Sequence, residues 1–421
     1  MTQSQASVAY NGPDLRGADL SRNVTSCEQS SQYAVGRLAC SRLTLSNFRC
    51  YEHLRLEPGA QPVVITGANG AGKTNVLEAL SFLVPGSGLR RAKLSDVGRR
   101  NLGEQVGRAW GVAATITGGT VPVSVGTGLE AGGGAKRVVH VDGEAQRALS
   151  VLSEHFAVHW LTPQMDRLFL DGSQERRRFL DRLVFGFDPA HAGRITAYNH
   201  ALRERARLLN DGKMDDAWLS ALEDTMATRG LAVAAARLGV AERLAGACEK
   251  IGGEKMGGPF PASTLAIDGL AEGWLMELPA LEVEDRLRAA LKRSRSADAA
   301  HGGAGNGIDG RLPHQSDLLV THAAKMMPAG QCSTGEQKML LVGLVLAAAR
   351  LSASDEGRTP VLLLDEVAAH LDAHHRGALF DEVVALGCQA WFTGTDAELF
   401  APLSAHAKFY SIEDAAIADA S

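Results

Sequence analysis

The sequence lacks the features that mark secreted, disulfide-stabilised and membrane-spanning proteins. Its six cysteines are scattered without a Cys-x-x-Cys spacing, which argues against a zinc site or a disulfide framework. Residues 1–40 are polar and contain no apolar core of a signal peptide. The longest apolar run, Met339–Ala349, is far shorter than the roughly 20 residues that cross a bilayer. We therefore expect a cytoplasmic protein without a membrane anchor, in which residues 1–40 form a disordered extension.

An excess of positive charge is also missing. The chain has 43 Lys and Arg against 48 Asp and Glu, so its formal net charge is −5. A nucleic-acid partner would have to be attracted by local basic patches, because the global field does not favour it. The 421 residues, 45% of them hydrophobic, are enough for two domains or for one domain with a large insertion.

What the sequence does contain is a complete P-loop. An apolar strand, Val63–Thr66, leads into a glycine loop, and a helix begins after it. Glycines let the backbone wrap an anion with its N–H groups, Lys73 reaches the outer phosphates, and the Thr74 hydroxyl can ligate Mg²⁺. The alternative is a glycine-rich turn that matches by chance. The expected nucleotide-binding residues are Gly67, Ala68, Asn69, Gly70, Ala71, Gly72, Lys73, Thr74 and Asn75.

A second apolar strand ends in two carboxylates. Residues 360–364 are followed directly by Asp365 and Glu366. This pattern is expected where Asp365 holds the Mg²⁺ shell and Glu366 acts as the catalytic group that polarises the attacking water. A core strand with an acidic end is the alternative.

A third stretch, residues 332–338, precedes the very apolar helix at Met339–Ala349. Its Ser333 and Gly335 N–H groups would lie at a helix N-terminus, which suits a phosphate. By itself it could be an ordinary helix cap. Since this loop lies at the far end of a helix packed on the same sheet, we expect it to serve the nucleotide of a second subunit.

The order of these stretches predicts one ATPase with an inserted domain. Alternating apolar residues from Leu43 to Leu56 and short β-rich runs over 107–141 indicate an antiparallel sheet beside the P-loop. Apolar residues at helical spacing from Ile195 to Ala241 indicate a helical hairpin that turns near Asp211. Arg176–Arg178 and Arg203, Arg205 and Arg207 give this region a basic polar face, for which solvated helix surface is the alternative. The composition of residues 292–310 predicts a flexible linker.

The expected fold class is therefore α/β: a P-loop ATPase domain with an antiparallel β subdomain and an inserted helical arm. We divide the chain into the extension at 1–40, the first ATPase segment with the P-loop at 41–165, the arm at 166–300 and the second ATPase segment at 301–421.

Together these residues resemble the RecF family of ABC-type, SMC-like ATPases over about Leu43 to Phe400. The stretches that carry the resemblance are Leu45–Tyr51, the P-loop with 75–80, Arg177–Asp181, Pro313–Asp317, the signature-like Ser333–Gln337, the Walker B-like Val361–Glu366 and the D-loop-like Leu371–Asp372.

The resemblance implies an ATP- and Mg²⁺-dependent DNA-binding protein of recombinational repair and replication restart. Such proteins form ATP-driven homodimers, act with RecR and RecO to load RecA at single-stranded gaps, and support SOS induction. The resemblance also makes Gln164 a candidate ligand of Mg²⁺ beside Thr74 and Asp365. It assigns Ser333, Gly335, Gln337 and Asp372 to the partner's ATP. Arg90 and Arg91 look like an arginine loop near the phosphates, and with Arg203 and Arg207 they are the candidate DNA-binding residues.

The chain departs from the family pattern at Gln315, His370, Thr334 and Glu336, and residues 391–395 contain no switch histidine. The missing histidine suggests slow ATP hydrolysis that acts as a timer. An ABC transporter ATPase subunit is the first rival, but its insertion would be far shorter. A long-arm structural ATPase of the SMC type would need hundreds of heptad residues, and an unrelated P-loop kinase or GTPase gives no reason for Ser333–Gln337.

Overall fold

The computed structural model describes residues 37–419, apart from 101–102, 105–106, 131–135, 213–214, 253–257, 356 and 414. Of the expected extension, residues 1–36 lie outside the described part. Strand β1 (Ala39–Phe48) begins inside the range expected to be disordered, and Arg37 forms a bridge with Thr359. The reason is burial, because Leu38, Ala39 and Cys40 are at most 4% exposed.

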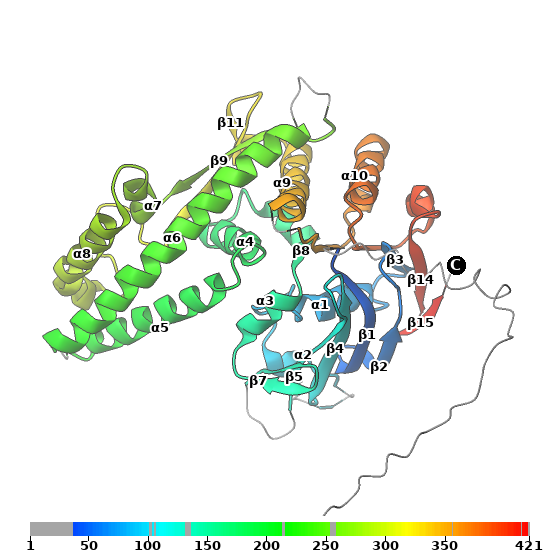
Figure 1. Cartoon of the computed structure of the whole chain (residues 1–421), viewed down its shortest axis with the longest axis horizontal. Coiled ribbons are helices and arrows are strands. Elements are labelled where there is room, and N and C mark those ends of the chain that lie inside the picture. Colours follow the sequence, from blue (N-terminus) through cyan, green and yellow to red (C-terminus); the bar gives the residue numbers. More distant parts are fainter. Residues whose placement is uncertain are drawn as a thin grey trace, which may run out of the picture. The chain divides into compact units, whose positions relative to one another are not determined.

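A six-stranded, mostly parallel sheet is the base of the ATPase (Figure 1). Its central strands come from different parts of the chain: Leu364 of β12 (Val361–Leu364) lies beside Phe392 of β13 (Ala390–Gly394) on one side and beside Leu161 of β8 (Val158–Leu161) on the other. Parallel strands end at the same edge, so the segments after β3, β12, β13 and β8 meet there. In spatial order the strands are β15 (Ala416–Asp419), β14 (Lys408–Glu413), β3 (Val63–Gly67), β13 (Ala390–Gly394), β12 (Val361–Leu364) and β8 (Val158–Leu161).

The parallel sheet separates two hydrophobic cores. Alternate side chains of a strand point to opposite faces, so Val64 of β3 belongs to one core and its neighbours Val63 and Ile65 to the other. The first core takes its apolar side chains from α9 (Thr334–Asp355), α10 (Ala373–Leu386) and the arm. The second contains the P-loop helix α1 (Lys73–Ser81) and the antiparallel sheet. Both faces of the sheet are therefore buried.

The antiparallel sheet confirms the predicted alternation. Leu43, Leu45 and Phe48 of β1 are fully buried, and β1 pairs with both β2 and β4. Short helix α2 (Leu94–Val97) lies between β2 and β4 in the sequence, and α3 (Leu152–His155) follows β7. Its strands, in spatial order, are β2 (Tyr51–Leu56), β1, β4 (Trp110–Thr117), β5 (Val123–Leu129), β6 (Val138–Val141) and β7 (Glu144–Gln146).

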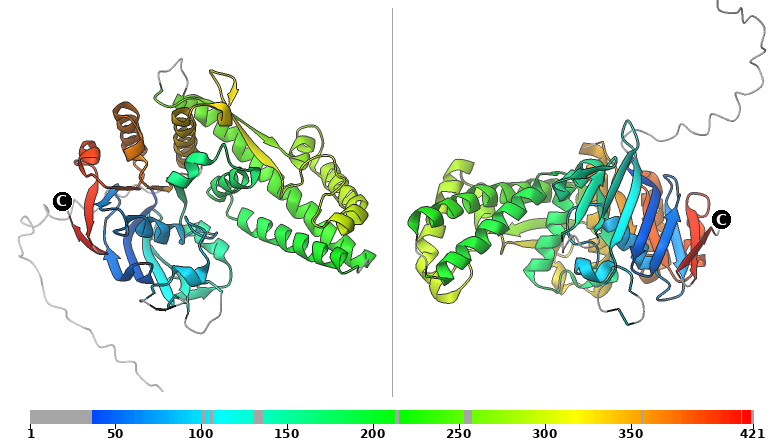
Figure 2. Two further views of the ribbon diagram at one scale, coloured as in Figure 1. Left: turned by 180° about the vertical axis from the view of Figure 1, so that it is seen from behind. Right: turned by 90° about the horizontal axis from the view of Figure 1, so that it is seen from below.

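The middle of the chain forms the predicted helical arm. Helices α5 and α6 lie side by side in both views of Figure 2 and turn at Asp211–Gly212, where the sequence places the turn. The region also contains a three-stranded sheet that the local patterns do not predict. Its central strand, β10 (Asp317–His322), pairs with β9 (Ser263–Asp268) of the expected arm and with β11 (Met327–Pro328). The helices of this region are α4 (Ser173–Phe185), α5 (His191–Asn210), α6 (Asp216–Gly252), α7 (Leu270–Leu275) and α8 (Ala280–His301).

The predicted flexible linker over residues 292–310 is wrong. Helix α8 runs on to His301, and Ala304 and Leu312 beyond it are buried in the core of the arm. Arg295 is held by Glu223 at 2.6 Å, although its sequence surroundings are strongly basic. Structured packing on the arm thus continues past the expected boundary at residue 300.

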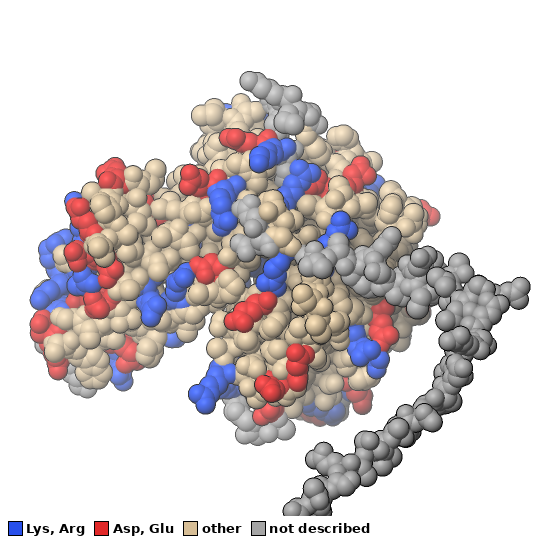
Figure 3. Space-filling model, in the orientation of Figure 1, with Lys and Arg blue, Asp and Glu red and all other residues tan. Residues whose placement is uncertain are grey.

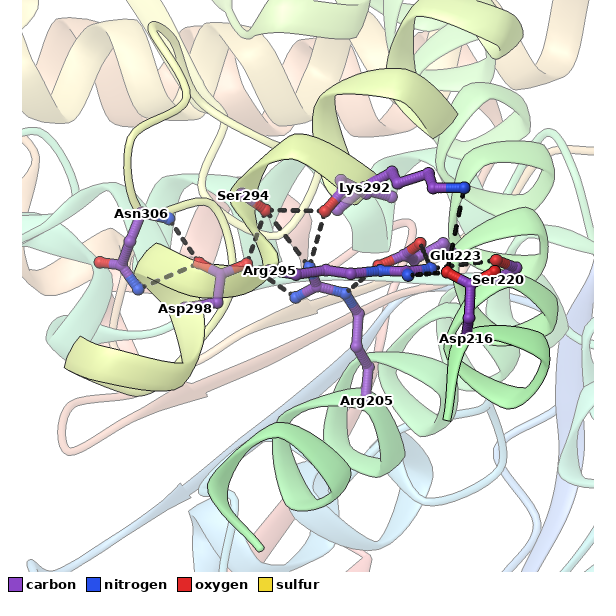
Figure 4. Close-up of polar contacts among 10 residues, drawn as sticks. Arg205, Asp216, Ser220, Glu223, Lys292, Ser294, Arg295, Asp298 and Asn306 are labelled. Carbon is purple, nitrogen blue, oxygen red and sulfur yellow. Dashed lines mark hydrogen bonds and ion pairs between the residues drawn. The ribbon is translucent and has the colours of Figure 1, made fainter. Parts of the chain in front are cut away.

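The expectation for Arg205 is also wrong, because its guanidinium is fully buried instead of lying on a polar face. It donates to Glu223 at 3.0 Å and to Asp298 at 2.7 Å (Figure 4). Ser294 donates to Asp298 at 2.7 Å, and the Asn306 backbone N–H also donates to it at 2.7 Å. The network ties α5, α6 and α8 together and fixes the loop after α8.

Helix α9 is the apolar centre of the first core. Residues Thr334–Ser354 are long and apolar enough to cross a membrane, but 78% of the most apolar window is buried inside the protein. The prediction that Met339–Ala349 lies in a buried helix is therefore confirmed.

Candidate nucleotide site

The P-loop connects β3 to α1 in a conformation that needs glycine. Gly67 and Gly72 have φ of 151° and 115°, and both approach neighbouring groups closely. A Cβ on Gly67 would lie 2.4 Å from the Ile412 carbonyl oxygen, and one on Gly72 would lie 2.8 Å from the Tyr51 hydroxyl. Larger residues at either position would displace the loop from β14 or from the β1–β2 hairpin.

Lys73, the first residue of α1, is folded back over this loop. Its ammonium donates to the carbonyls of Gly67 at 2.8 Å and Ala68 at 3.0 Å, and the residue is 4% exposed. The first turn of α1 also presents backbone N–H groups that have no partner within the helix. A buried cation and N–H donors therefore converge on one loop, which is the electrostatic arrangement that an anionic phosphate requires.

Thr74 and Asp365 meet across the edge of the parallel sheet. The Thr74 hydroxyl donates to Asp365 Oδ1 at 2.9 Å, although the two residues are distant in sequence. Asp365 is 6% exposed, and burial raises the pKa of its carboxyl against the opposing hydrogen bonds from Thr393 and Thr74. The sequence predicts both residues as ligands of one magnesium ion, and the structure brings them together.

Thr393 is a residue of this site that sequence reasoning missed. Its hydroxyl donates to Asp365 Oδ1 at 2.8 Å and accepts from the Glu366 N–H at 3.0 Å. Thr393 stands near the end of β13, the strand beside β12, in the stretch that has no switch histidine. A polar residue near the end of an apolar strand was the available signal, but only the strand order connects it with Asp365.

Glu366 has a left-handed backbone, with φ of 54°. Residues other than glycine adopt this conformation at a cost of about 1–3 kcal/mol, and such residues gather at functional sites. The hydrogen bond from its N–H to Thr393 holds the conformation. The backbone is thus consistent with a catalytic carboxylate that must be placed accurately.

Gln164 and the two predicted loop arginines line one cavity of about 290 Å³. Gln164 lies in the 3-10 helix Pro163–Arg167 that follows β8, whose Leu161 carbonyl accepts from the Asp365 N–H at 2.9 Å. Arg90 donates to the Asn75 side chain at 2.8 Å, which ties it to the P-loop helix. Arg91 pairs with Glu175 of α4 at 2.5 Å. Arg90 thus contacts the P-loop side of the cavity and Arg91 the arm side.

The signature-like stretch caps α9. Ser333 and Glu336 form a reciprocal capping box, since the Ser333 N–H donates to Glu336 Oε2 at 2.9 Å and the Glu336 N–H donates to Ser333 Oγ at 3.4 Å. Hydrogen bonds from Lys325, then from Ser333, lower the pKa of Glu336 to about 2. The ordinary helix cap, the alternative for this stretch, is therefore present. A role of Ser333 toward the nucleotide of a second subunit stays a prediction.

The other residues predicted to act on a partner's ATP differ in what they do within the chain. Gln337 is buried and donates to the Cys332 carbonyl at 2.8 Å. Asp372 caps α10 by accepting from the His375 N–H at 2.9 Å. Gly335 has open space around its Cα, so nothing in the described part of the chain demands glycine there.

The arm arginines predicted to bind DNA are engaged locally. Arg203 donates to the Asn199 carbonyl at 3.1 Å, and Arg207 pairs with Glu204 one turn earlier at 2.7 Å. On the face shown in Figure 3, basic and acidic side chains are interspersed over the arm. A single arm therefore presents no large patch of one sign among the described residues on this face.

The residues present fit ATP and Mg²⁺. The loop combines backbone N–H donors with the buried Lys73, and a Cβ placed on Gly70 would meet no heavy atom within 4 Å, so space is open beside it. Thr74 and Asp365 offer a hydroxyl and a carboxylate oxygen 2.9 Å apart, which are ligands that Mg²⁺ prefers.

Comparison with known proteins identifies the family of this chain. The family model of the RecF/RecN/SMC N-terminal domain matches residues 39–416. The DNA replication and repair protein RecF of Mesorhizobium japonicum is 46% identical over 374 residues, covering 89% of this chain and 96% of the relative. The protein of the same name from Caulobacter vibrioides is 48% identical over 383 residues, covering 89% and 96%. The chain belongs to the RecF family.

Solved structures agree on the fold. A structure of the recombination mediator protein RecF-ATPrS in the RecFOR pathway matches this RecF-family chain with a TM-score of 0.78 at 20% identity, covering 92% of this chain and 100% of the other. An SMC head domain from Pyrococcus furiosus reaches only 0.50 at 14% identity, covering 90% and 95%. The α/β ABC-type fold is confirmed, and the RecF-type interpretation is favoured over the SMC-like alternative.

Proposed function

We propose that this RecF-family chain is an ATP-dependent DNA-binding protein of recombinational repair and replication restart. The observation that carries the nucleotide part is the hydrogen bond between Thr74 and Asp365 at 2.9 Å, which joins a P-loop to a carboxylate strand from the other end of the chain. The names of the relatives, DNA replication and repair protein RecF, support the biological role.

In this proposal Lys73 and the loop N–H groups hold the triphosphate, while Thr74, Asp365 and Gln164 hold Mg²⁺. The metal would neutralise charge on the phosphate oxygens. Glu366 polarises the attacking water and accepts its proton. Thr393 orients both carboxylate residues, since it bonds Asp365 and the Glu366 backbone. Residues 391–395 contain no switch histidine to take up a proton, so hydrolysis is slow and serves as a timer.

The proposal includes an ATP-driven homodimer. Ser333, Gly335 and Gln337 at the start of α9, together with Asp372, would contact the ATP held by the partner's P-loop. Support comes from the N-terminus of α9, whose capping box leaves part of the first turn's N–H groups available for an anion. Two arms and two ATPase domains would then form a composite basic surface for single-stranded DNA or gap junctions.

RecR and RecO are the proposed protein partners, RecA loading is the proposed outcome, and the cytoplasm is the proposed location. The structural neighbour RecF-ATPrS is a recombination mediator of the RecFOR pathway, which supports this assignment.

The test is analytical ultracentrifugation of the full-length protein with Mg²⁺ alone, with ATP, and with ATP plus gapped DNA. The proposal predicts a monomer, a dimer and a dimer–DNA complex in turn. A sedimentation coefficient that is unchanged by ATP would contradict the dimer, and a dimer that ignores DNA would contradict the DNA-binding role.

A further inference from the structure

A cavity of about 730 Å³ lies where the segment after α1 faces α4, α5 and α6. Its walls bring five guanidinium groups together, and among the lining residues one carboxylate, Asp181, faces them. None of the P-loop residues 67–75 lines it. The arginines are Arg91, Arg177, Arg178, Arg182 and Arg237.

Two carboxylates neutralise part of this charge. Asp181 binds Arg237 in a bidentate pair at 2.8 and 2.9 Å. Glu175 is shared, since it pairs with Arg91 at 2.5 Å and with Arg178 at 2.7 Å. After these contacts, Arg91 and Arg178 have one negative charge between them.

Arg177 and Arg182 have no carboxylate within ion-pair distance among the described residues. Arg177 donates to the Ser316 carbonyl at 2.7 Å. Arg182 stacks on the Trp160 ring, 4.1 Å from its centre, and its buried Nε has no hydrogen-bond partner in the described part of the chain. Its Nη2 reaches only the Met165 sulfur, at 3.6 Å.

Burial without a carboxylate partner is unfavourable for the charged form of a guanidinium group. Burial is the main cause that lowers the pKa of Arg182 to about 9, and it also lowers the pKa of Arg177. A charged group out of water is normally paired, and leaving it unpaired is unfavourable. Both side chains line the cavity, so an anion bound inside it would supply the missing partner.

We propose that this cavity binds a nucleotide-sized ligand through its phosphate, with Arg177 and Arg182 as the phosphate-binding residues. A planar guanidinium matches two phosphate oxygens. The volume lies in the range of small-molecule sites, roughly 300–1,000 Å³. Asn199 and Gln174 on the walls offer neutral donors and acceptors for the rest of the ligand. None of the P-loop residues lines this cavity, although Arg91, Trp160 and Arg182 also line the smaller cavity that contains Gln164. The proposal does not depend on the function proposed above.

The first test uses inorganic pyrophosphate as the probe. Isothermal titration of the full-length protein, with the P-loop saturated by Mg²⁺ and a non-hydrolysable ATP analogue, should show one pyrophosphate site. Arg177→Gln and Arg182→Gln should each weaken it about tenfold or more. Arg286→Gln, an exposed arginine paired with Glu282 on α8, is the control and should change nothing. Equal affinity in all variants, or no binding at all, would overturn the proposal.

A second measurement uses the native protein and needs no variant. Crystals of the native protein soaked in tungstate, a phosphate analogue with an anomalous signal, should show a peak in this cavity beside Arg177 or Arg182. A peak at the P-loop alone would contradict the proposal.

The source of the phosphate is distinguished by competition against bound pyrophosphate. Displacement by dAMP assigns a free nucleotide, and displacement by a short oligothymidine but not by dAMP assigns a DNA strand. If neither displaces pyrophosphate, the proposed nucleotide class is wrong.

Discussion

The Thr393 hydroxyl donates to Asp365 at 2.8 Å while it accepts from the Glu366 N–H at 3.0 Å. One side chain from β13 thus fixes the two acidic residues that follow β12. The groups proposed to hold Mg²⁺ and to polarise water are therefore positioned by the same hydroxyl, although neither is near it in sequence.

Thr393→Val should keep the shape of this residue and remove both hydrogen bonds. The Glu366 N–H would lose its partner, which costs about 1–3 kcal/mol of stability where the group is buried. ATP binding, measured by titration, should survive, and the steady-state hydrolysis rate should fall. Thr264→Val, at an exposed position of β9, is the matched control. Unchanged hydrolysis in Thr393→Val would show that the hydroxyl has no positioning role.

Glu366→Gln should bind ATP and Mg²⁺ normally and hydrolyse ATP about 10²–10⁴-fold more slowly, because the amide cannot accept a proton from water. Asp365→Asn should instead weaken the Mg²⁺ dependence of ATP binding. Titrations at several Mg²⁺ concentrations and single-turnover rates separate the two effects. If Asp365→Asn were the milder variant in both assays, the two roles would be exchanged.

Ser333→Arg should leave ATP binding by the monomer intact and prevent ATP-driven dimers, because the cation would fill the space proposed for the partner's γ-phosphate. Sedimentation velocity with ATP measures the dimer. Ser404→Arg adds the same side chain at an exposed residue away from α9 and should still dimerise. Loss of ATP binding by the Ser333→Arg monomer would indicate that the signature acts within one chain.

Arg205→Met should destabilise the arm by about 3–5 kcal/mol, because it leaves Asp298 buried without its cation and leaves Glu223 paired with Arg295 alone. Chemical denaturation followed by circular dichroism measures the loss. Arg203→Met, at an exposed position of the same helix, is the control. A loss below about 1 kcal/mol, the level of a surface ion pair, would mean that the network contributes little.

The hydrogen-bond network around Arg205 makes the stability of the arm depend on pH. Burial opposes ionisation of Asp298, but hydrogen bonds from Ser294, Arg205 and Asn306 outweigh it and hold its pKa below the ordinary value. A carboxyl with a lowered pKa in the folded state contributes stability above its unfolded pKa, and this contribution is lost as the pH falls through the folded pKa. The difference in stability between the native protein and Arg205→Met should therefore shrink in acid.

Structural features that depend on residues close together in the chain can be predicted from the sequence. The P-loop, the acidic end of β12, the β1–β2 alternation and the turn at Asp211 each depend on residues close together in the chain, and the structure contains all of them. Thr393 could not be assigned, because its contact with Asp365 follows from β13 lying beside β12. Strand order is set by tertiary packing, which local patterns do not record.

The error over residues 292–310 has the same physical origin. The neighbours of Arg295 and Asp298 are polar, which suggests a solvated linker, yet the partners Glu223 and Arg205 lie on α6 and α5. Buried ion pairs satisfy such residues only after the helices assemble. Charge alone likewise suggested solvent exposure for Arg205, which is fully buried.

In the proposed function, ATP controls DNA binding. Fluorescence anisotropy with gapped DNA, with and without ATP and from about 50 to 200 mM salt, tests it directly. We expect tight binding only with ATP, a steep loss of affinity with salt, and weakened binding in Arg203→Glu and Arg207→Glu. Lys73→Met, which removes the cation at the phosphates, should abolish the effect of ATP. DNA affinity that is indifferent to ATP, salt and these substitutions would rule out ATP-controlled DNA binding and indicate a nucleotide-switched protein partner instead.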